Sequence, residues 1–480
     1  MNFKMIGNTV GKVALIESGL LVLPLITSII YQESSVWSIL ITMAIALILG
    51  ALLLLIFRPK DRVIYSKEGF IIVAFAWIVL SLIGAIPFTI SGEIPSYIDA
   101  LFETVSGFTT TGSSILTNVE GLSKSLLMWR SFSQWIGGMG ILVFVIALMP
   151  KSNDRSIHIL RAEMPGPSVD KLVPHSKDTA KILYLIYIGL TGILIALLAF
   201  GEMDLYESIV HALATAGTGG FGIKNVGLAA YSSYSQWVIA IFMLLYGINF
   251  NLYFLILVGK FKSLFKNTEF LTYLGIVIVT TILVCLNVYP LFNNLSDTIR
   301  TSFFQVSSIV TTTGYATYDF TYWNSTTQIL LIFLMFIGGS SGSTAGGFKV
   351  SRIVIIFKRI KYELKKLINP RSVDILSMDG KRIDDAMVNS TTTYLGIYIL
   401  TFAIVLTIIS LDGFDFLTNF SATLACINNV GPGLSLVGPM ANYSTYSPLS
   451  KIVLSFAMLL GRLEIYPLLL ALSPTVWFKK

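Results

Sequence analysis

Long apolar stretches separated by polar segments run along almost the whole chain. A helix that crosses about 30 Å of hydrocarbon needs roughly 20 mostly apolar residues, so each such stretch predicts a membrane-spanning helix. The first stretch is interpreted as a span and not a signal peptide, because no small-residue cleavage site follows it. Ten spans are predicted, near residues 9–31, 37–57, 69–91, 126–149, 181–200, 235–258, 270–290, 325–348, 392–411 and 450–472.

Four segments between these spans are too polar to cross a membrane and too apolar to be ordinary loops. Each begins with an amphipathic run that predicts a short helix, and each then breaks into small and hydroxylated residues around a glycine. The segments are 97–125, 204–234, 295–324 and 413–447. The breaks are TTTGSS at 109–114, GTGGFG at 217–222, TTTGYA at 311–316 and NNVGPG at 428–433.

The spacing of these breaks suits repeats of membrane topology. The predicted fold class is an all-α polytopic membrane protein, with two leading transmembrane helices and four pseudo-symmetric helix–pore loop–helix repeats around one pore. The predicted boundaries are 1–67 for the leading helices, 68–178 for repeat 1, 179–268 for repeat 2, 269–390 for repeat 3 with an intramembrane gating loop and a basic cytoplasmic segment, and 391–480 for repeat 4.

Composition supports a lipid environment. Only 12% of the 480 residues are charged and 54% are hydrophobic, whereas soluble domains carry about 25% charged residues. The net charge of +7 is an orientation signal, because Lys and Arg gather in alternate loops on what is then the cytoplasmic side. We therefore expect no nucleic-acid partner, a multi-pass protein of the inner cell membrane, and cytoplasmic N- and C-termini. The basic loops are 58–67, 150–181, 259–266 and 349–382.

The four breaks suit a dehydrated cation. Non-helical backbone at membrane depth is tolerated only where it is buried in protein or lines water. Four such stretches around one axis can replace a hydration shell with backbone carbonyls. Glycine is needed there because the required backbone angles are unfavourable for residues with a Cβ. Each break taken alone could also be an ordinary extracellular turn. The predicted centre glycines are Gly112, Gly219, Gly314 and Gly431.

The stretches SGFTTTGSSIL, TAGTGGFG, TTTGY and NNVGPG resemble the four filter segments of the Trk/Ktr/HKT cation transporter superfamily. GGSSGSTAGGFKVSRI at 338–353, MLLGRLEIYP at 458–467 and the MPGP…DKL…DTAK loop at 164–181 are also similar to that superfamily. The two leading spans make the chain more similar to its TrkH-type potassium transporter subunits than to its KtrB-type members.

This resemblance implies potassium uptake by a homodimer with one pore per protomer. It also implies a cytosolic nucleotide-binding regulatory subunit of the TrkA or KtrA type, since the chain itself is expected to bind potassium but no nucleotide. A sodium-conducting or ion-coupled transporter of the same superfamily is the alternative. The implied potassium-binding residues are Thr110, Thr111, Gly112, Gly217, Thr218, Gly219, Thr312, Thr313, Gly314, Asn429, Val430 and Gly431.

Residues 338–347 place five glycines inside the eighth predicted span. A glycine costs about 1 kcal/mol relative to alanine in a helix, so this span is expected to open into a loop. The resemblance implies a movable barrier beneath the filter; the alternative is a close helix–helix contact between small residues. The predicted gating residues of this loop are Gly338, Gly339, Gly342, Gly346 and Gly347.

Arg462 lies within the last predicted span, where an ionisable group is costly and indicates a functional site. We expect its charge to face the pore as a further gating residue and to repel cations. The alternatives are a structural ion pair with Glu464 and a side chain that reaches the inner surface. The amphipathic basic run at 358–371 predicts a surface for lipid headgroups and for the regulatory subunit.

The run Gly339-Ser340-Ser341-Gly342 also fits the GxSG pattern of intramembrane serine proteases. A serine nucleophile needs a base within hydrogen-bond reach. The three histidines are His158, His175 and His211, and none follows Ser341 as such proteases require. The chain is therefore predicted not to be an enzyme, and His211 is interpreted as a packed, hydrogen-bonded side chain.

Overall fold

The computed structural model describes residues 1–59, 66–140, 176–292, 294–370 and 375–478. Within these residues the protein is almost entirely helical. The one hairpin that they contain pairs β1 (Ser377–Met378) antiparallel with β2 (Lys381–Arg382). Most of each predicted loop, 58–67 and 150–181, lies outside the described residues, as do the MPGP stretch, His158 and His175.

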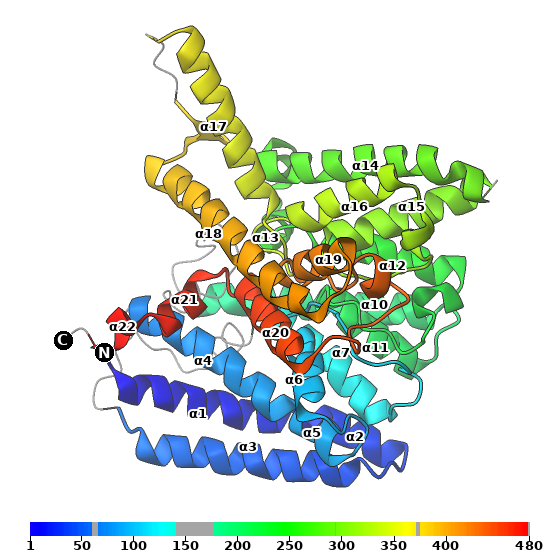
Figure 1. Cartoon of the computed structure of the whole chain (residues 1–480), viewed down its shortest axis with the longest axis vertical. Helices are drawn as coiled ribbons and strands as arrows, with labels where there is room; N and C mark the ends of the chain where they lie inside the picture. Colours follow the sequence, from blue (N-terminus) through cyan, green and yellow to red (C-terminus); the bar gives the residue numbers. More distant parts are fainter. Residues whose placement is uncertain (60–65, 141–175, 293, 371–374, 479–480) are drawn as a thin grey trace.

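The leading part consists of α1 (Phe3–Leu20), α2 (Val22–Ile30) and α3 (Val36–Ile56). Helices α1 and α3 lie side by side along one flank of the molecule (Figure 1). They come close together at Gly11 and Gly50, where a Cβ on Gly50 would lie 2.9 Å from the Gly11 carbonyl oxygen. Small residues let two helix backbones meet in this way inside a membrane.

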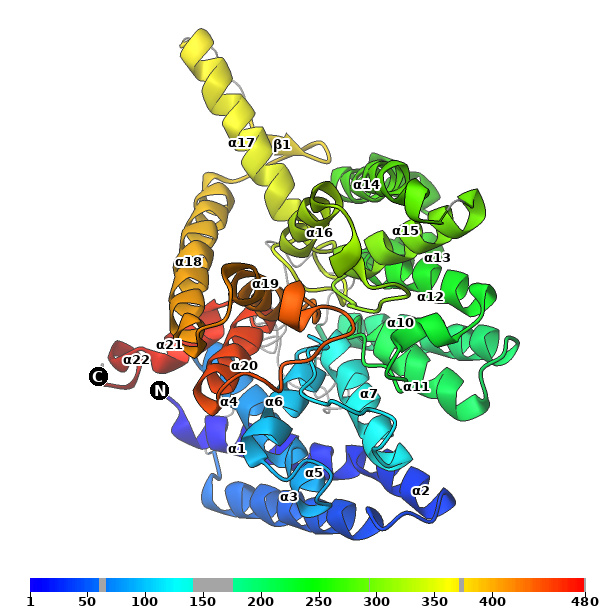
Figure 2. The same cartoon turned by 45° about the vertical axis from the view of Figure 1, so that its right-hand side comes forward.

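Four further groups of helices surround the centre of the molecule, which is occupied by extended chain (Figure 2). The first two groups are α4 (Ser66–Gly84), α5 (Ile86–Ile90), α6 (Tyr97–Phe108) and α7 (Lys124–Met139), then α10 (Ser176–Ala199), α11 (Leu205–Ala216), α12 (Ser233–Tyr246) and α13 (Phe250–Leu257). The last two are α14 (Thr268–Phe292), α15 (Leu295–Val310), α16 (Ser325–Ile337) and α17 (Val350–Ile368), then α18 (Asp385–Ile409), α19 (Phe416–Ile427), α20 (Pro448–Arg462), α21 (Tyr466–Leu472) and α22 (Pro474–Phe478). Short 3₁₀ turns cover Gly227–Ala230, Phe261–Lys266, Phe320–Tyr322, Ser410–Asp412 and Ser435–Val437.

The predicted amphipathic runs form the short helices α6, α11, α15 and α19. Each begins at a residue whose side-chain oxygen accepts a hydrogen bond from a backbone N–H of the first turn, which satisfies an otherwise unpaired donor. These N-cap residues are Ser96, Asp204, Asn294 and Asp415. Each helix points its C-terminus at the centre of the molecule, where the chain becomes extended.

Three of the ten predicted spans are interrupted within the described residues. Six described helices are long and apolar enough to cross a membrane, or seven if α12 and α13, bent by 92°, count as one span. The second long helix of each group breaks inside its apolar stretch, at Met139, Tyr246, Ile337 and Arg462. Hydropathy registers the apolar residues on both sides of a break but not the break itself. The predicted spans near 235–258, 325–348 and 450–472 are therefore interrupted, and residues 141–149 lie outside the described part.

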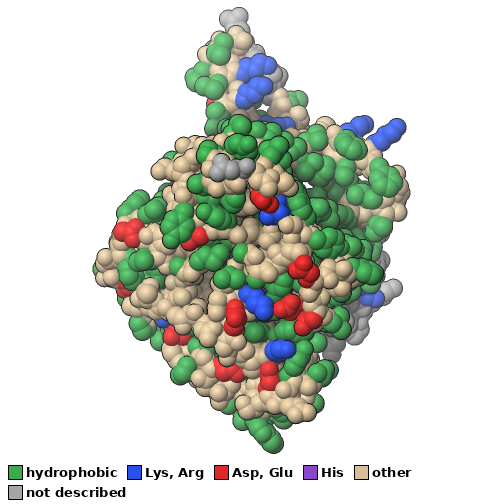
Figure 3. Space-filling model, turned by 90° about the vertical axis from the view of Figure 1, so that its right-hand side faces the viewer, with side chains coloured by type: hydrophobic (Ala, Val, Ile, Leu, Met, Phe, Trp, Pro, Cys, Tyr) green, Lys and Arg blue, Asp and Glu red, His purple; other side chains and the backbone are tan. Residues whose placement is uncertain are grey.

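Large hydrophobic side chains are exposed along the outward faces of α3 and α14. Ile48, Ile56 and Leu286 are each at least 60% exposed. Such exposure of large apolar side chains is expected of helices that face lipid. The face shown in Figure 3 carries acidic and basic side chains interspersed with hydrophobic ones and with other polar and backbone atoms. The chain is thus a polytopic helical membrane protein, as predicted.

The contact between α1 and α3 predicts a position-dependent effect of leucine. Gly11→Leu should lower the thermal midpoint of the purified protein, because overpacking a tight contact costs about 1–3 kcal/mol. Gly19→Leu in the same helix is the control, since a Cβ there meets nothing within 4 Å. Equal midpoints for the two variants would show that the contact does not stabilise the protein.

Candidate ion pathway

Four extended stretches follow the short helices and have the same backbone conformation. We call them the glycine segments: residues 109–112, 217–220, 311–314 and 428–431. The third residue of each donates its N–H to the carbonyl five residues earlier, at 2.8–2.9 Å in every case. The second residue has a φ of 53–55° in all four (Thr110, Thr218, Thr312 and Asn429). The fourth residue is a glycine at positive φ: 80° at Gly112, 73° at Gly220, 84° at Gly314 and 100° at Gly431.

This register corrects one prediction. The glycine equivalent to Gly112 is Gly220 and not Gly219, which instead corresponds to Thr111. Likewise, Gly217 corresponds to Thr109. It is therefore not one of the two residues directly before Gly220, which are Thr218 and Gly219. The sequence contained a signal for this, because Thr218 stands two residues before Gly220 as Thr110 stands two residues before Gly112.

The glycine segments close into a ring in chain order. A Cβ on Gly112 would lie 2.0 Å from the carbonyl oxygen of Gly219, in the second segment. The remaining three contacts repeat this geometry: 1.9 Å from Gly220 to the oxygen of Thr313, 2.2 Å from Gly314 to that of Val430, and 2.6 Å from Gly431 to that of Thr111. Only a residue without a Cβ fits at these four points, so the four third-position carbonyls come together around one centre.

Hydroxyl side chains support two of the glycine segments. The Oγ1 atoms of Thr109 and Thr111 lie 2.7 Å apart, and those of Thr311 and Thr313 lie 2.8 Å apart. In the fourth segment, the Asn429 Nδ2 donates to the Thr111 Oγ1 at 2.9 Å, which ties the fourth segment to the first. All five side chains are buried.

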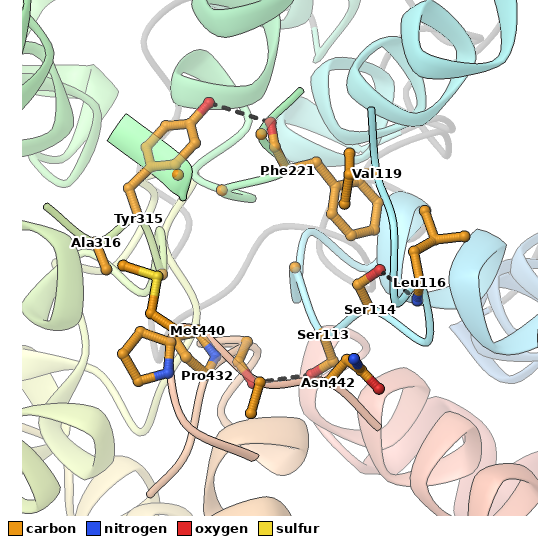
Figure 4. A pocket seen from close by; sticks show the side chains of 18 of the residues that line it. Ser113, Ser114, Leu116, Val119, Phe221, Tyr315, Ala316, Pro432, Met440 and Asn442 are labelled. Atoms are coloured by element: carbon orange, nitrogen blue, oxygen red, sulfur yellow. Dashed lines mark hydrogen bonds between the residues drawn. The ribbon is translucent and has the colours of Figure 1, made fainter. Parts of the chain in front are cut away.

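A cavity of about 190 Å³ adjoins the ring on one side. All four positive-φ glycines line it, and Ser113, Phe221, Tyr315 and Pro432, which follow them in the chain, surround it (Figure 4). None of its described lining residues is a carboxylate. The oxygen atoms available to a cation here are therefore those of carbonyls, hydroxyls and amides.

The loop between α16 and α17 contacts two of the glycine segments, the third and the fourth, within their first two residues. The Gly346 N–H donates to the Thr312 Oγ1 at 2.6 Å, and the Gly347 N–H donates to the Asn428 carbonyl at 2.9 Å. The chain is non-helical from Gly338 to Lys349, so the predicted opening of the span is confirmed and the alternative helix–helix contact is wrong. The loop therefore lies against the third and fourth segments, at the ends away from the glycines that line the cavity.

Hydrogen bonds to two further parts of the chain also hold this loop. The Ser340 N–H donates to the Gly247 carbonyl at 3.0 Å, at the break between α12 and α13. The Ser341 N–H donates to the Glu269 Oε1 at 2.6 Å, at the start of α14. Glu269 was not singled out from the sequence, although a lone acid at the edge of an apolar run marks it.

Arg462 joins the loop to the ring. Its guanidinium donates to the carbonyl oxygens of Thr344 at 3.0 Å and Gly138 at 2.6 Å, and it also contacts Gly137. The Thr110 Oγ1 lies 3.5 Å away. The ion pair that the structure shows for Glu464 is with Arg352, and not with Arg462. The charge of Arg462 therefore lies beneath the first glycine segment.

The remaining polar candidates have structural partners. His211 is buried, with its ring nitrogens 3.3 Å from the Tyr315 hydroxyl and 3.1 Å from the Tyr231 hydroxyl. The Ser341 hydroxyl contacts that of Ser351 and not a histidine. These contacts agree with a packed His211, and no described histidine lies against the Ser341 hydroxyl.

Two buried polar side chains near the ring were not predicted from the sequence. Glu103 pairs with Arg130 at 2.8 Å and accepts from the Ile115 N–H at 3.0 Å, which braces the chain leaving the first segment. Gln134 contacts the second segment, its Nε2 donating to the Gly219 carbonyl at 2.7 Å. The sequence did show a charged or amide side chain inside each amphipathic helix. It could not show what that side chain contacts, because the partners are distant in the chain.

Comparisons with known proteins agree with this arrangement. A family model described as "TrkH: Cation transport protein" matches residues 36–477. The Trk system potassium uptake protein TrkH of Escherichia coli (strain K12) is 36% identical, over 99% of this chain and 100% of the relative. The protein of the same name from Vibrio parahaemolyticus is 33% identical, over 99% and 100%.

A solved structure is also similar over the full length. The crystal structure of the potassium transporter TrkH from Vibrio parahaemolyticus has a TM-score of 0.90 and 31% sequence identity, covering 99% of this chain and 100% of the other. These relatives are named as transport proteins and not as enzymes. The chain belongs to the TrkH family of cation transport proteins.

Proposed function

We propose that this chain takes up potassium ions across the cytoplasmic membrane through the ring of glycine segments. The closed ring carries the proposal, because four converging carbonyls can replace the hydration shell of a potassium ion. The names of relatives that cover almost the whole chain support potassium as the ion. The proposed ligands are Thr110 to Gly112, Thr218 to Gly220, Thr312 to Gly314 and Asn429 to Gly431.

The loop from Gly338 to Lys349 acts, in this proposal, as the gate. Its hydrogen bonds to Thr312 and Asn428 support this role, because they keep peptide groups under the ring. Arg462 adds a positive charge at the same level and bonds the loop at Thr344. Opening then requires the loop to move away from both the ring and the guanidinium.

The proposal includes a homodimer in the inner membrane, with both termini in the cytoplasm and a regulator of the TrkA or KtrA type. Helix α17 supports a cytoplasmic partner, because it projects from the body of the protein (Figure 1). It exposes Phe357, Leu367 and Ile368, each at least 68%, beside Lys365 and Lys366. The relatives are named as parts of a Trk system, which also favours a multi-component assembly.

Liposomes that contain the purified protein should take up potassium or its tracer rubidium down a gradient, and should take up sodium more slowly. The measurement is isotope uptake, without a partner and then with candidate regulators and nucleotides. Protein-free liposomes provide the background. Uptake indistinguishable from that background under every condition would overturn the proposed function.

Serine at any of Gly112, Gly220, Gly314 or Gly431 should lower the potassium-over-sodium uptake ratio about tenfold, equivalent to about 1.4 kcal/mol. The added Cβ would displace the carbonyl of the next segment. Gly222→Ser is the matched control, since it also lines the cavity but its Cβ would meet only the Lys224 oxygen, at 3.8 Å. A glycine of the four that accepts serine with an unchanged ratio does not belong to the filter.

Arg462→Gln should raise uptake in the absence of a regulator. A unit charge at 4 Å opposes a cation by about 4 kcal/mol at an effective dielectric constant of about 20, and glutamine removes it. Arg300→Gln, which breaks a partly exposed pair with Asp297 on α15, is the control. Thermal stability is measured on the same preparation. A large loss of stability with unchanged uptake would assign Arg462 to structure alone.

A further inference from the structure

The second glycine segment lacks the side chains that support the first and third. In those two segments, threonines at the first and third positions contact each other through their hydroxyl groups. The corresponding residues of the second segment are Gly217 and Gly219. The backbone of this segment therefore has no side chain of its own at either supporting position.

Gln134 of α7 occupies the space that these glycines leave. Its side chain is fully buried, and a Cβ on Gly219 would lie 2.3 Å from its Cδ. A Cβ on Gly217 would lie 2.2 Å from its backbone oxygen. Both glycines are thus required by the close approach of α7, so one repeat provides the support for the segment of the next.

The Gln134 amide uses both of its polar atoms on the second segment. Its Nε2 donates to the Gly219 carbonyl at 2.7 Å, and its Oε1 accepts from the Phe221 N–H at 3.1 Å. The two bonds lie on either side of Gly220. They hold the peptide groups around that glycine in one orientation, as a clamp with two fixed points.

The clamped carbonyl is one of the four that form the ring, since it is the oxygen that faces Gly112. Among the described residues, the equivalent carbonyls of Thr111, Thr313 and Val430 accept no such hydrogen bond. One oxygen of the four therefore has a neutral N–H donor at 2.7 Å. That donor fixes its direction and competes with a cation for its lone pairs.

We propose that Gln134 is a specificity-determining residue, which restrains the Gly219 carbonyl and so keeps the ring from contracting around an ion smaller than potassium. The inference rests on the proposed function, in which the ring selects potassium. Gln134 acts through the Gly219 carbonyl and is itself a positioning residue. Selectivity should therefore depend on a side chain that belongs to none of the four glycine segments.

Gln134→Met tests the clamp, because methionine has a similar length and volume but no amide. The potassium-over-sodium uptake ratio should fall about three- to tenfold, the range expected for about one lost hydrogen bond. Gln236→Met is the matched control: Gln236 of α12 is a buried glutamine whose Nε2 donates to the carbonyls of Leu228 and Tyr231, away from the ring. It should lose thermal stability but keep the wild-type ratio.

A second pair of variants tests the same contact and does not depend on whether Gln134→Met folds. Gly219→Thr alone should abolish uptake, because its Cβ collides with the Gln134 side chain. The double variant Gly219→Thr with Gln134→Ala removes that collision and should recover uptake. Its ratio should stay below that of the wild type, since no amide then reaches the carbonyl.

Two results would overturn the inference: a wild-type ratio in Gln134→Met, or no gain of uptake in the double variant over Gly219→Thr alone. Failure of the proposed function would look different. In that case, the wild-type protein itself would take up no potassium or rubidium, or would fail to discriminate between potassium and sodium.

Discussion

The close approach of four backbone segments, each placing a glycine Cα against a neighbour's carbonyl oxygen, is the constraint on which the rest of the molecule depends. These contacts leave no room for a Cβ at Gly112, Gly220, Gly314 or Gly431. They also hold three threonines and an asparagine at positive φ, a conformation that costs of order 1–3 kcal/mol per residue. Such a strained ring is stable only because the surrounding helices hold its backbone in place. The capped short helices α6, α11, α15 and α19 supply that frame.

The breaks in the second long helices follow from the same constraint. A Cβ on Gly137 would lie 1.8 Å from the Phe108 oxygen, and one on Gly461 would lie 2.1 Å from the Ile427 oxygen. Phe108 and Ile427 each end a short helix immediately before a glycine segment. The second helices of the first and fourth groups therefore reach the ring at a glycine and end within two residues of it. The guanidinium of Arg462 lies where these two ends meet.

Much of this architecture could be predicted from local patterns. The amphipathic runs before each break identified the four short helices, and the glycine content of 338–347 identified the loop, because both depend on neighbours in the chain. The choice between Gly219 and Gly220 could not be made from glycine content, since it depends on which residue faces another segment. The breaks at Tyr246 and Arg462 could not be predicted for a related reason: these helix ends are set by tertiary contacts. The partners of Arg462 and Gln134 are more than eighty residues away from them in the chain.

The ring of contacts also has a sense of rotation. The first segment meets the second, the second the third, the third the fourth and the fourth the first, each through its own glycine and the other's oxygen. Every segment therefore contributes its glycine to one contact and its carbonyl oxygen to another, so the two partners of each contact play different roles. A Cβ added at one glycine would first displace the carbonyl of the segment that follows in the chain, except at Gly431, where it would displace that of the first segment. The four repeats thus occupy distinguishable places in the ring, even where their backbone angles are the same, because each presents its glycine to a different neighbour.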